Sequence, residues 1–195
     1  MHLKSLIAKI THDFGWHQER SLTFASMVFG LIDQRNVQHH ALSTSLETKG
    51  FLKSKLERIR RFFAKQVINY EEFAYTLVQT VFQKIPQMDL ILDRTNWKLG
   101  KKDINYLVLV AKVGPVTFPL LWSLLEHQGC SDLDQRKQIL ERFRATFGFQ
   151  FIRSFTADRE FIGKDWLDYL CINNIPFLSA LRIIGLFSGA KINGL

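Results

Sequence analysis

Two patterns of hydrophobic and polar residues follow one another along the chain. Up to Pro86, apolar residues recur at helical spacing in segments separated by polar breaks. Beyond Pro86, short runs of β-branched and aromatic residues alternate with amphipathic stretches, which is typical of strands and helices in series. The sequence therefore predicts a helical region at residues 1–86, a mixed α+β or α/β core at residues 87–181, and an atypical tail at residues 182–195.

The N-terminal region is expected to consist of helices. The predicted segments cover residues 3–33 with an interruption around Gly15, 37–46, 51–64 and 70–84. In the helix at 51–64, one side is apolar, and we expect Leu52, Leu56, Ile59 and Phe63 to face inward.

The other side of the 51–64 helix is strongly basic. It carries Lys53, Lys55, Arg58, Arg61 and Lys65. Because a turn with Gly50 joins this helix to a preceding short one, the pair is compatible with a helix-turn-helix, whose second helix contacts DNA. A solvated basic face is the alternative interpretation of these five residues.

The region after Pro86 predicts strands and helices in a defined order. The strands are expected at 87–93, 104–113, 116–122, 151–157 and 177–181, and the helices at 132–147 and 159–172. Residues 94–103 are expected to form a basic loop. Consecutive strands with short links are normally antiparallel, whereas a strand–helix–strand link is a right-handed parallel crossover. A mixed sheet follows, in which the 151–157 strand can lie parallel to the 87–93 strand.

An acidic residue stands at the end of each of these two strands. Asp93 follows Leu90-Ile91-Leu92, and Asp158 follows the 151–157 strand. If the strands are parallel neighbours, both carboxylates lie at the same edge of the sheet. Adjacent carboxylates remain ionised when they share a cation, and hard oxygen ligands favour Mg²⁺ or Mn²⁺ over zinc. The alternative for Asp93 is an acid that begins a turn.

Composition favours a polyanionic partner. Lys and Arg number 26 against 18 Asp and Glu, which gives a formal charge of +8. Nucleic acid is the first partner expected of such a chain. Basic residues also surround the predicted acidic edge, where they would hold a DNA backbone or serve only as solubilising charge: Arg94, Lys98, Lys101, Lys102 and Arg159.

The two cysteines and one long apolar run further limit the class of protein. Cys130 and Cys171 fit neither a disulfide scaffold nor a zinc site, so a reducing cytoplasm is expected. The apolar run at 104–125 is interrupted by Gly114-Pro115 and is rich in strand-forming residues. It predicts a hairpin, and no membrane partner is expected.

The two acidic segments resemble those of a known family. Residues 92–98 read Leu-Asp-Arg-Thr-Asn-Trp-Lys, and residues 157–163 read Ala-Asp-Arg-Glu-Phe-Ile-Gly. Together they resemble bacterial insertion-sequence transposases of the DDE, RNase H-like superfamily, over about residues 52–177. The resemblance implies an RNase H-like mixed sheet flanked by helices, cut-and-paste DNA transposition with Mg²⁺ or Mn²⁺, and a nucleoid-associated bacterial location. It also implies a helical N-terminal region that binds the double-stranded element ends, and it assigns Asp93 and Asp158 to the catalytic metal-binding triad.

The chain departs from that family beyond Asp158. The family's third catalytic residue is a Glu in a Tyr-Arg-Glu type motif, which does not occur before the last residue, Leu195. Glu160, Asp165 and Asp168 do not match this motif. We hypothesise that a frameshift truncated a longer transposase and left residues 178–195 out of frame. Sequencing the DNA downstream tests this idea, and absence of a Tyr-Arg-Glu motif from every frame would exclude it.

Three interpretations of function follow. The first is an incomplete DDE transposase that binds DNA and has little strand-transfer activity alone. The second is a non-catalytic DNA-binding or dimer-forming fragment that competes with full-length transposase at element ends. The third is an unrelated metal-dependent nuclease with an RNase H-like core, which a third acid from within the chain would favour.

Overall fold

The computed structural model describes residues 2–100, 102–125, 129, 131–158, 161 and 163–178. The chain divides into two compact units, Met1–Asn69 and Tyr70–Leu195. The division therefore lies before the helix expected at 70–84, rather than at Pro86. This helix packs Ala74 and Val78 into the core beneath the sheet, so it belongs to the second unit although its periodicity resembles that of the N-terminal helices.

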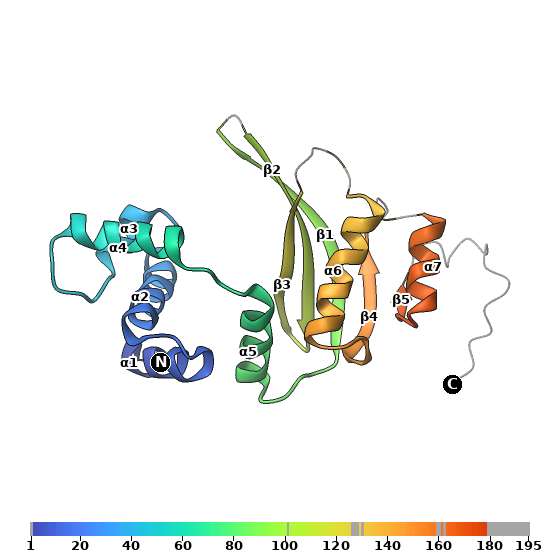
Figure 1. Cartoon of the computed structure of the whole chain (residues 1–195), viewed down its shortest axis with the longest axis horizontal. Coiled ribbons are helices and arrows are strands. Elements are labelled where there is room, and N and C mark those ends of the chain that lie inside the picture. The colour runs from blue at the N-terminus through green and yellow to red at the C-terminus, as the bar shows by residue number, and fades with distance from the viewer. Residues whose placement is uncertain are drawn as a thin grey trace. The chain divides into compact units, whose positions relative to one another are not determined.

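The first unit is helical (Figure 1). Its helices are α1 (Leu3–Phe14), α2 (Gln18–Gln34), α3 (His39–Thr44) and α4 (Leu52–Lys65). The stretch expected at 3–33 is thus two helices, because Gly15 adopts a left-handed conformation with φ of +61° and ends α1. A small core joins the helices through Met27, Leu42, Leu46, Ile59 and Phe62, and Trp16 and Phe24 pack against it.

Helix α4 buries Ile59 as predicted, but it packs Phe62 rather than Phe63 into this core. Ile59 and Phe62 are 0% and 5% exposed, whereas Phe63 is 58% exposed and Leu52 is 41% exposed. The ring of Phe62 stacks on Phe24 at a centroid distance of 6.0 Å, which fixes the rotation of the helix. The prediction for Leu52 and Phe63 was wrong because two adjacent phenylalanines compete for one inward position and tertiary packing decides between them.

The second unit is a mixed α/β structure. Its elements are α5 (Tyr70–Phe82), β1 (Met88–Leu99), β2 (Lys102–Val113), β3 (Val116–Leu125), α6 (Leu133–Thr146), a 3₁₀ turn (Phe149–Phe151), β4 (Ile152–Ala157), α7 (Lys164–Ile172) and β5 (Phe177–Leu178). The strand order is β3-β2-β1-β4-β5. The pairs β1–β2 and β2–β3 are antiparallel, and β1–β4 and β4–β5 are parallel. The predicted mixed sheet is confirmed, while residues 179–181 of the last predicted strand and the tail at 182–195 lie outside the described residues.

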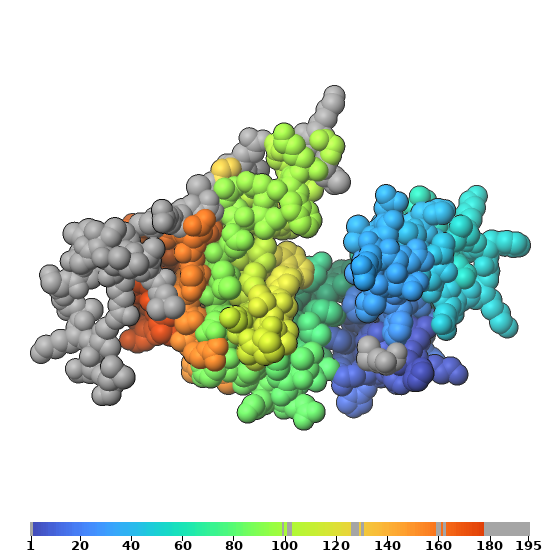
Figure 2. All heavy atoms as spheres, turned by 180° about the vertical axis from the view of Figure 1, so that it is seen from behind, coloured from blue at the N-terminus to red at the C-terminus, as the bar shows by residue number. Residues whose placement is uncertain are grey.

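The described helices of this unit lie on one side of the sheet (Figure 1). On that side, Leu90, Leu92, Leu107 and Leu109 are fully buried. Alternate residues on the other side are only partly buried, and Figure 2 shows the strands themselves on this face. The alternation is that of a sheet whose core lies on one face.

Helix α6 makes the crossover that places β4 beside β1. Asp132 begins it with a capping box, in which its carboxylate accepts from the Gln135 backbone N–H at 2.8 Å and the Gln135 side chain accepts from the Asp132 N–H at 3.0 Å. Ile139, Leu140 and Phe143 are fully buried against the sheet. Both features can be read from the sequence, because Asp is a favoured N-cap residue and Ile139, Leu140 and Phe143 recur at helical spacing.

A hydrogen-bonded ion pair joins β1 and β4 at their beginnings. The register shifts between Met88 and Asp89, and Arg153 and Ser154 both reach the Asp89 carboxylate. The Ser154 hydroxyl donates to Asp89 at 2.7 Å. These bonds from Arg153 and Ser154 lower the pKa of Asp89 from 3.8 to about 2.

We expect Asp89→Asn to lower the free energy of unfolding by about 1 kcal/mol at pH 7, since solvent screens a pair whose guanidinium is largely exposed. Because the pKa is lower in the folded chain, the carboxylate stabilises it above pH 4. That contribution is lost as the pH falls toward 2. Urea denaturation at pH 7 and pH 3 measures the difference, with the exposed Asp168→Asn as control. If Asp89→Asn lowered the free energy of unfolding equally at pH 7 and pH 3, the lowered pKa of Asp89 would be contradicted.

Candidate functional site

The sheet brings Asp93 and Asp158 to neighbouring positions. The last paired residues of β1 and β4 are Leu92 and Ala157, and the two acids follow directly. Neighbouring strands lie about 4.8 Å apart. Both side chains are exposed, so this pair of carboxylates opens to solvent at the end of the parallel pairing.

Strand β1 does not end at Asp93, in contrast to the prediction. It continues to Leu99 while paired with β2, and Asp93 lies opposite Val108. The expected loop at 94–103 is therefore the outer half of a long hairpin, which projects past the end of β4 in Figure 1. Thr95 and Trp97 alternate with polar residues at strand spacing, and this pattern extends the strand. The backbone of Asp93 is thus paired with β2 on one side. On the other side, the pairing with β4 ends one residue earlier, at Leu92 and Ala157.

The described contacts around the acidic edge are local. Asp93 accepts a hydrogen bond from the Arg94 N–H at 2.8 Å. The carbonyl of Asp158 accepts one from the Phe161 N–H at 3.0 Å.

Three of the basic residues predicted around the edge, Arg94, Lys98 and Lys102, lie on the hairpin strands. Arg94 is half-buried and Lys98 is exposed on β1. Trp97 is 64% exposed, and its ring packs edge-on against that of Tyr106 with a centroid distance of 6.4 Å. Only the backbone of Lys102 is described, and Lys101 and Arg159 lie outside the described residues.

The edge offers two potential metal ligands within the described part of the chain. No group of three or more His, Cys, Asp or Glu side chains occurs among these residues. Asp165 and Asp168 are exposed on α7 and do not complete such a group. Two carboxylates fit Mg²⁺, which commonly takes one or two from the protein and its other ligands from water and substrate phosphates.

The five basic residues predicted for α4 do not form one uniform face. The rotation set by Phe62 brings two of them into contact with other segments of the first unit: Lys55 donates to the Leu46 carbonyl at 2.7 Å, and Arg58 pairs with Glu19 at the surface at 2.6 Å. Arg61 makes only a long 3.4 Å bond to the Glu57 carbonyl. Lys53 and Lys65 are exposed and form no hydrogen bond or ion pair with the described residues.

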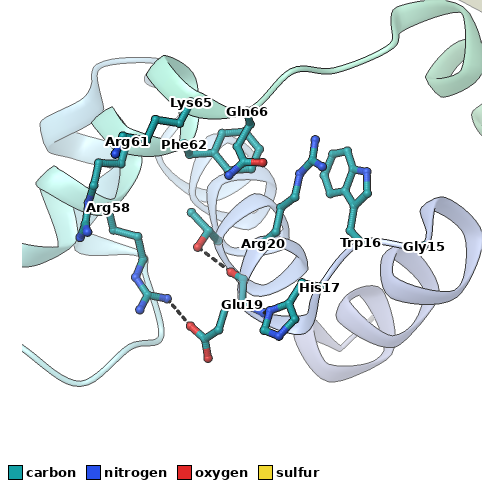
Figure 3. Close-up of a pocket in the computed structure, with 11 residues that line it drawn as sticks. Gly15, Trp16, His17, Glu19, Arg20, Arg58, Arg61, Phe62, Lys65 and Gln66 are labelled. Atoms are coloured by element: carbon teal, nitrogen blue, oxygen red, sulfur yellow. Dashed lines mark hydrogen bonds and ion pairs between the residues drawn. The ribbon is translucent and has the colours of Figure 1, made fainter.

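A cavity beside α4 contains residues that the sequence analysis did not identify. Trp16 and Arg20 line it together with the C-terminal half of α4 (Figure 3). The available signals were a tryptophan in the polar break after Gly15 and an arginine four residues later, one helical turn away.

No protein-family model, curated protein or solved structure matches the chain. None of the helices in the described ranges combines the length and the apolar composition needed to cross a bilayer.

The contacts of α4 predict different effects for two of its lysines. Lys55→Met should lower the stability of the first unit by about 1 kcal/mol, because it removes a partly buried hydrogen bond to Leu46. Lys53→Met, two residues earlier in the same helix at an exposed position, should leave stability unchanged. Thermal unfolding of both variants measures this. Equal melting temperatures would show that the Lys55 contact contributes nothing.

Proposed function

We propose that the chain is a DNA-binding protein of the transposase type, with an RNase H-like core built for metal-dependent phosphodiester chemistry. The observation that carries this proposal is the parallel register of β1 and β4, which sets Asp93 and Asp158 side by side. The two acidic motifs that resemble the DDE superfamily supply these same residues. An RNase H-like assignment also agrees with a mixed sheet whose central strand, β1, is antiparallel to β2 and parallel to β4.

Asp93 and Asp158 would hold Mg²⁺ or Mn²⁺ in this proposal. A bound ion of this kind polarises a phosphate and stabilises the charge that develops during phosphodiester cleavage. The exposed hairpin beside the edge adds Lys98 for backbone contact and Trp97 for stacking against a base. The double-stranded ends of a mobile element are the proposed DNA partner, and a second copy or a full-length transposase the proposed protein partner.

A second candidate function is a non-catalytic DNA-binding or dimerising fragment that interferes with full-length transposase. It is favoured by the absence of a third potential ligand beside the two carboxylates among the described residues. Under this alternative the basic surfaces bind element ends without cleavage. Strong Mg²⁺-dependent cleavage that Asp93→Ala abolishes would contradict it. A different nuclease with an RNase H-like core is less well supported, since Asp165 and Asp168 do not join the acidic edge in a ligand group.

The role of the acidic edge predicts how Mg²⁺ affects DNA binding. Mg²⁺ should tighten the binding of the full chain to a labelled duplex several-fold more than the same ionic strength of KCl, because the ion links the carboxylates to a phosphate. Asp93→Asn and Asp158→Asn should each abolish this effect and leave binding without Mg²⁺ equal or tighter.

Fluorescence anisotropy measures these affinities. Asp168→Asn is the matched control, since it removes one exposed carboxylate elsewhere in the same unit. The proposal fails if the two edge variants keep the full Mg²⁺ effect, or if the unmodified chain does not bind duplex DNA.

A further inference from the structure

The first unit contains a cavity of about 640 Å³ where the break between α1 and α2 meets α4. Four cationic side chains line it, and Glu19 is the one carboxylate among the lining residues. The cations are Arg20, Arg58, Arg61 and Lys65. Figure 3 shows Arg20 against Trp16 on one side of Phe62, while Arg61 and Lys65 extend from α4 on its other side. An excess of positive charge beside apolar walls favours an anionic ligand.

Arg20 is held in a fixed position at this cavity. Its guanidinium lies over the Trp16 ring, 3.8 Å from the centroid, and donates to the Val67 carbonyl at 3.1 Å. Its buried Nε has no hydrogen-bond acceptor among the described residues. Desolvation by burial lowers the pKa of Arg20. The side chain is thus a partly dehydrated cation without a carboxylate partner of its own.

The one carboxylate that lines the cavity, that of Glu19, already forms an ion pair. Glu19 accepts a hydrogen bond from Arg58 at 2.6 Å, and Figure 3 shows it turned toward Arg58 and away from the Arg20–Trp16 pair. Lys65 forms no ion pair within the described part of the chain, and Arg61 has only its long bond to Glu57. Three cations therefore remain available to an anionic ligand.

The cavity also adjoins the N-terminus of α2. His17 precedes this helix of 17 residues and also lines the cavity. The N-terminal end of a helix carries a partial positive charge that stabilises an anion. This field adds to that of the three side chains.

We propose that this cavity seats a stretch of nucleic-acid backbone, with Arg20 contacting one phosphate and Arg61 and Lys65 contacting a neighbouring one. The inference rests on the proposed DNA-binding function and deepens it. Guanidinium groups match the oxygens of a phosphate through paired hydrogen bonds, and the fixed Arg20 loses little side-chain freedom on binding. The remaining exposed cations of α4, such as Lys53, extend the positive surface outside the cavity and favour a polymer over an isolated phosphate.

The test compares two double variants of the full chain. Arg61→Gln with Lys65→Gln removes two charges from the cavity. Lys53→Gln with Arg60→Gln removes two charges from the same helix outside it. Thermal unfolding confirms that both variants fold, and anisotropy with a labelled duplex measures the dissociation constant across a range of KCl concentrations.

We expect the cavity variant to lose at least tenfold in affinity and the control less than threefold. The slope of log K against log salt should fall by about 0.9 in the cavity variant, which corresponds to one phosphate contact. Equal losses in the two variants would overturn the pocket and leave DNA binding through a diffuse basic surface intact.

A second measurement decides the source of the phosphate. The indole N–H resonance of Trp16, assigned with Trp16→Phe, should shift on titration with inorganic phosphate but not with chloride at equal ionic strength. Arg20→Gln should abolish this shift, because Arg20 lies over the Trp16 ring, and a shift that persists would overturn Arg20 as a ligand. If the unmodified chain binds inorganic phosphate or phosphatidic acid vesicles but not DNA, the nucleic-acid assignment fails together with the proposed function.

Discussion

The parallel pairing of β1 with β4 is the constraint on which the second unit depends. Helix α6 can return the chain to the sheet only as a crossover, and its buried Ile139, Leu140 and Phe143 hold that crossover against the core. The pairing ends at Leu92 and Ala157, and the residue that follows each of them in the sequence is an acid. A register displaced by one residue would turn one side chain to the opposite face of the sheet. The adjacency of Asp93 and Asp158 is therefore a consequence of the register in which β1 pairs with β4.

The sequence was sufficient to predict an element where its local residue pattern is compatible with a single structure. The spacing of apolar residues in α6, its Asp132 cap, and the Gly114-Pro115 turn each determine an element from local chemistry, and the structure confirms all of them. The order of strands and helices then determined the parallel neighbour of β1. The metal-binding and catalytic roles of the two acids remain predictions.

The sequence was insufficient where tertiary packing chose between local alternatives. Phe62 and Phe63 are equivalent in pattern, and only contact with Phe24 selects Phe62 for the core. That choice engages Lys55 and Arg58 in contacts within the first unit, while their DNA-binding role remains a prediction. Arg61 and Lys65 line the same cavity as Arg20, which joins segments far apart in the sequence. In the hairpin, the basic residues suggested a loop although the alternating Thr95 and Trp97 favoured a strand.

The central claim is that Asp93 and Asp158 share one cation, and titration of the full chain with Mn²⁺, followed by the electron paramagnetic resonance signal of free Mn²⁺, tests it most directly. The account predicts that Asp93→Asn and Asp158→Asn each weaken the bound Mn²⁺ at least tenfold. It also predicts that the double variant loses little more than either single one, because the first substitution already dismantles the shared site. Unchanged Mn²⁺ affinity in both single variants, or independent and additive losses, would contradict the account.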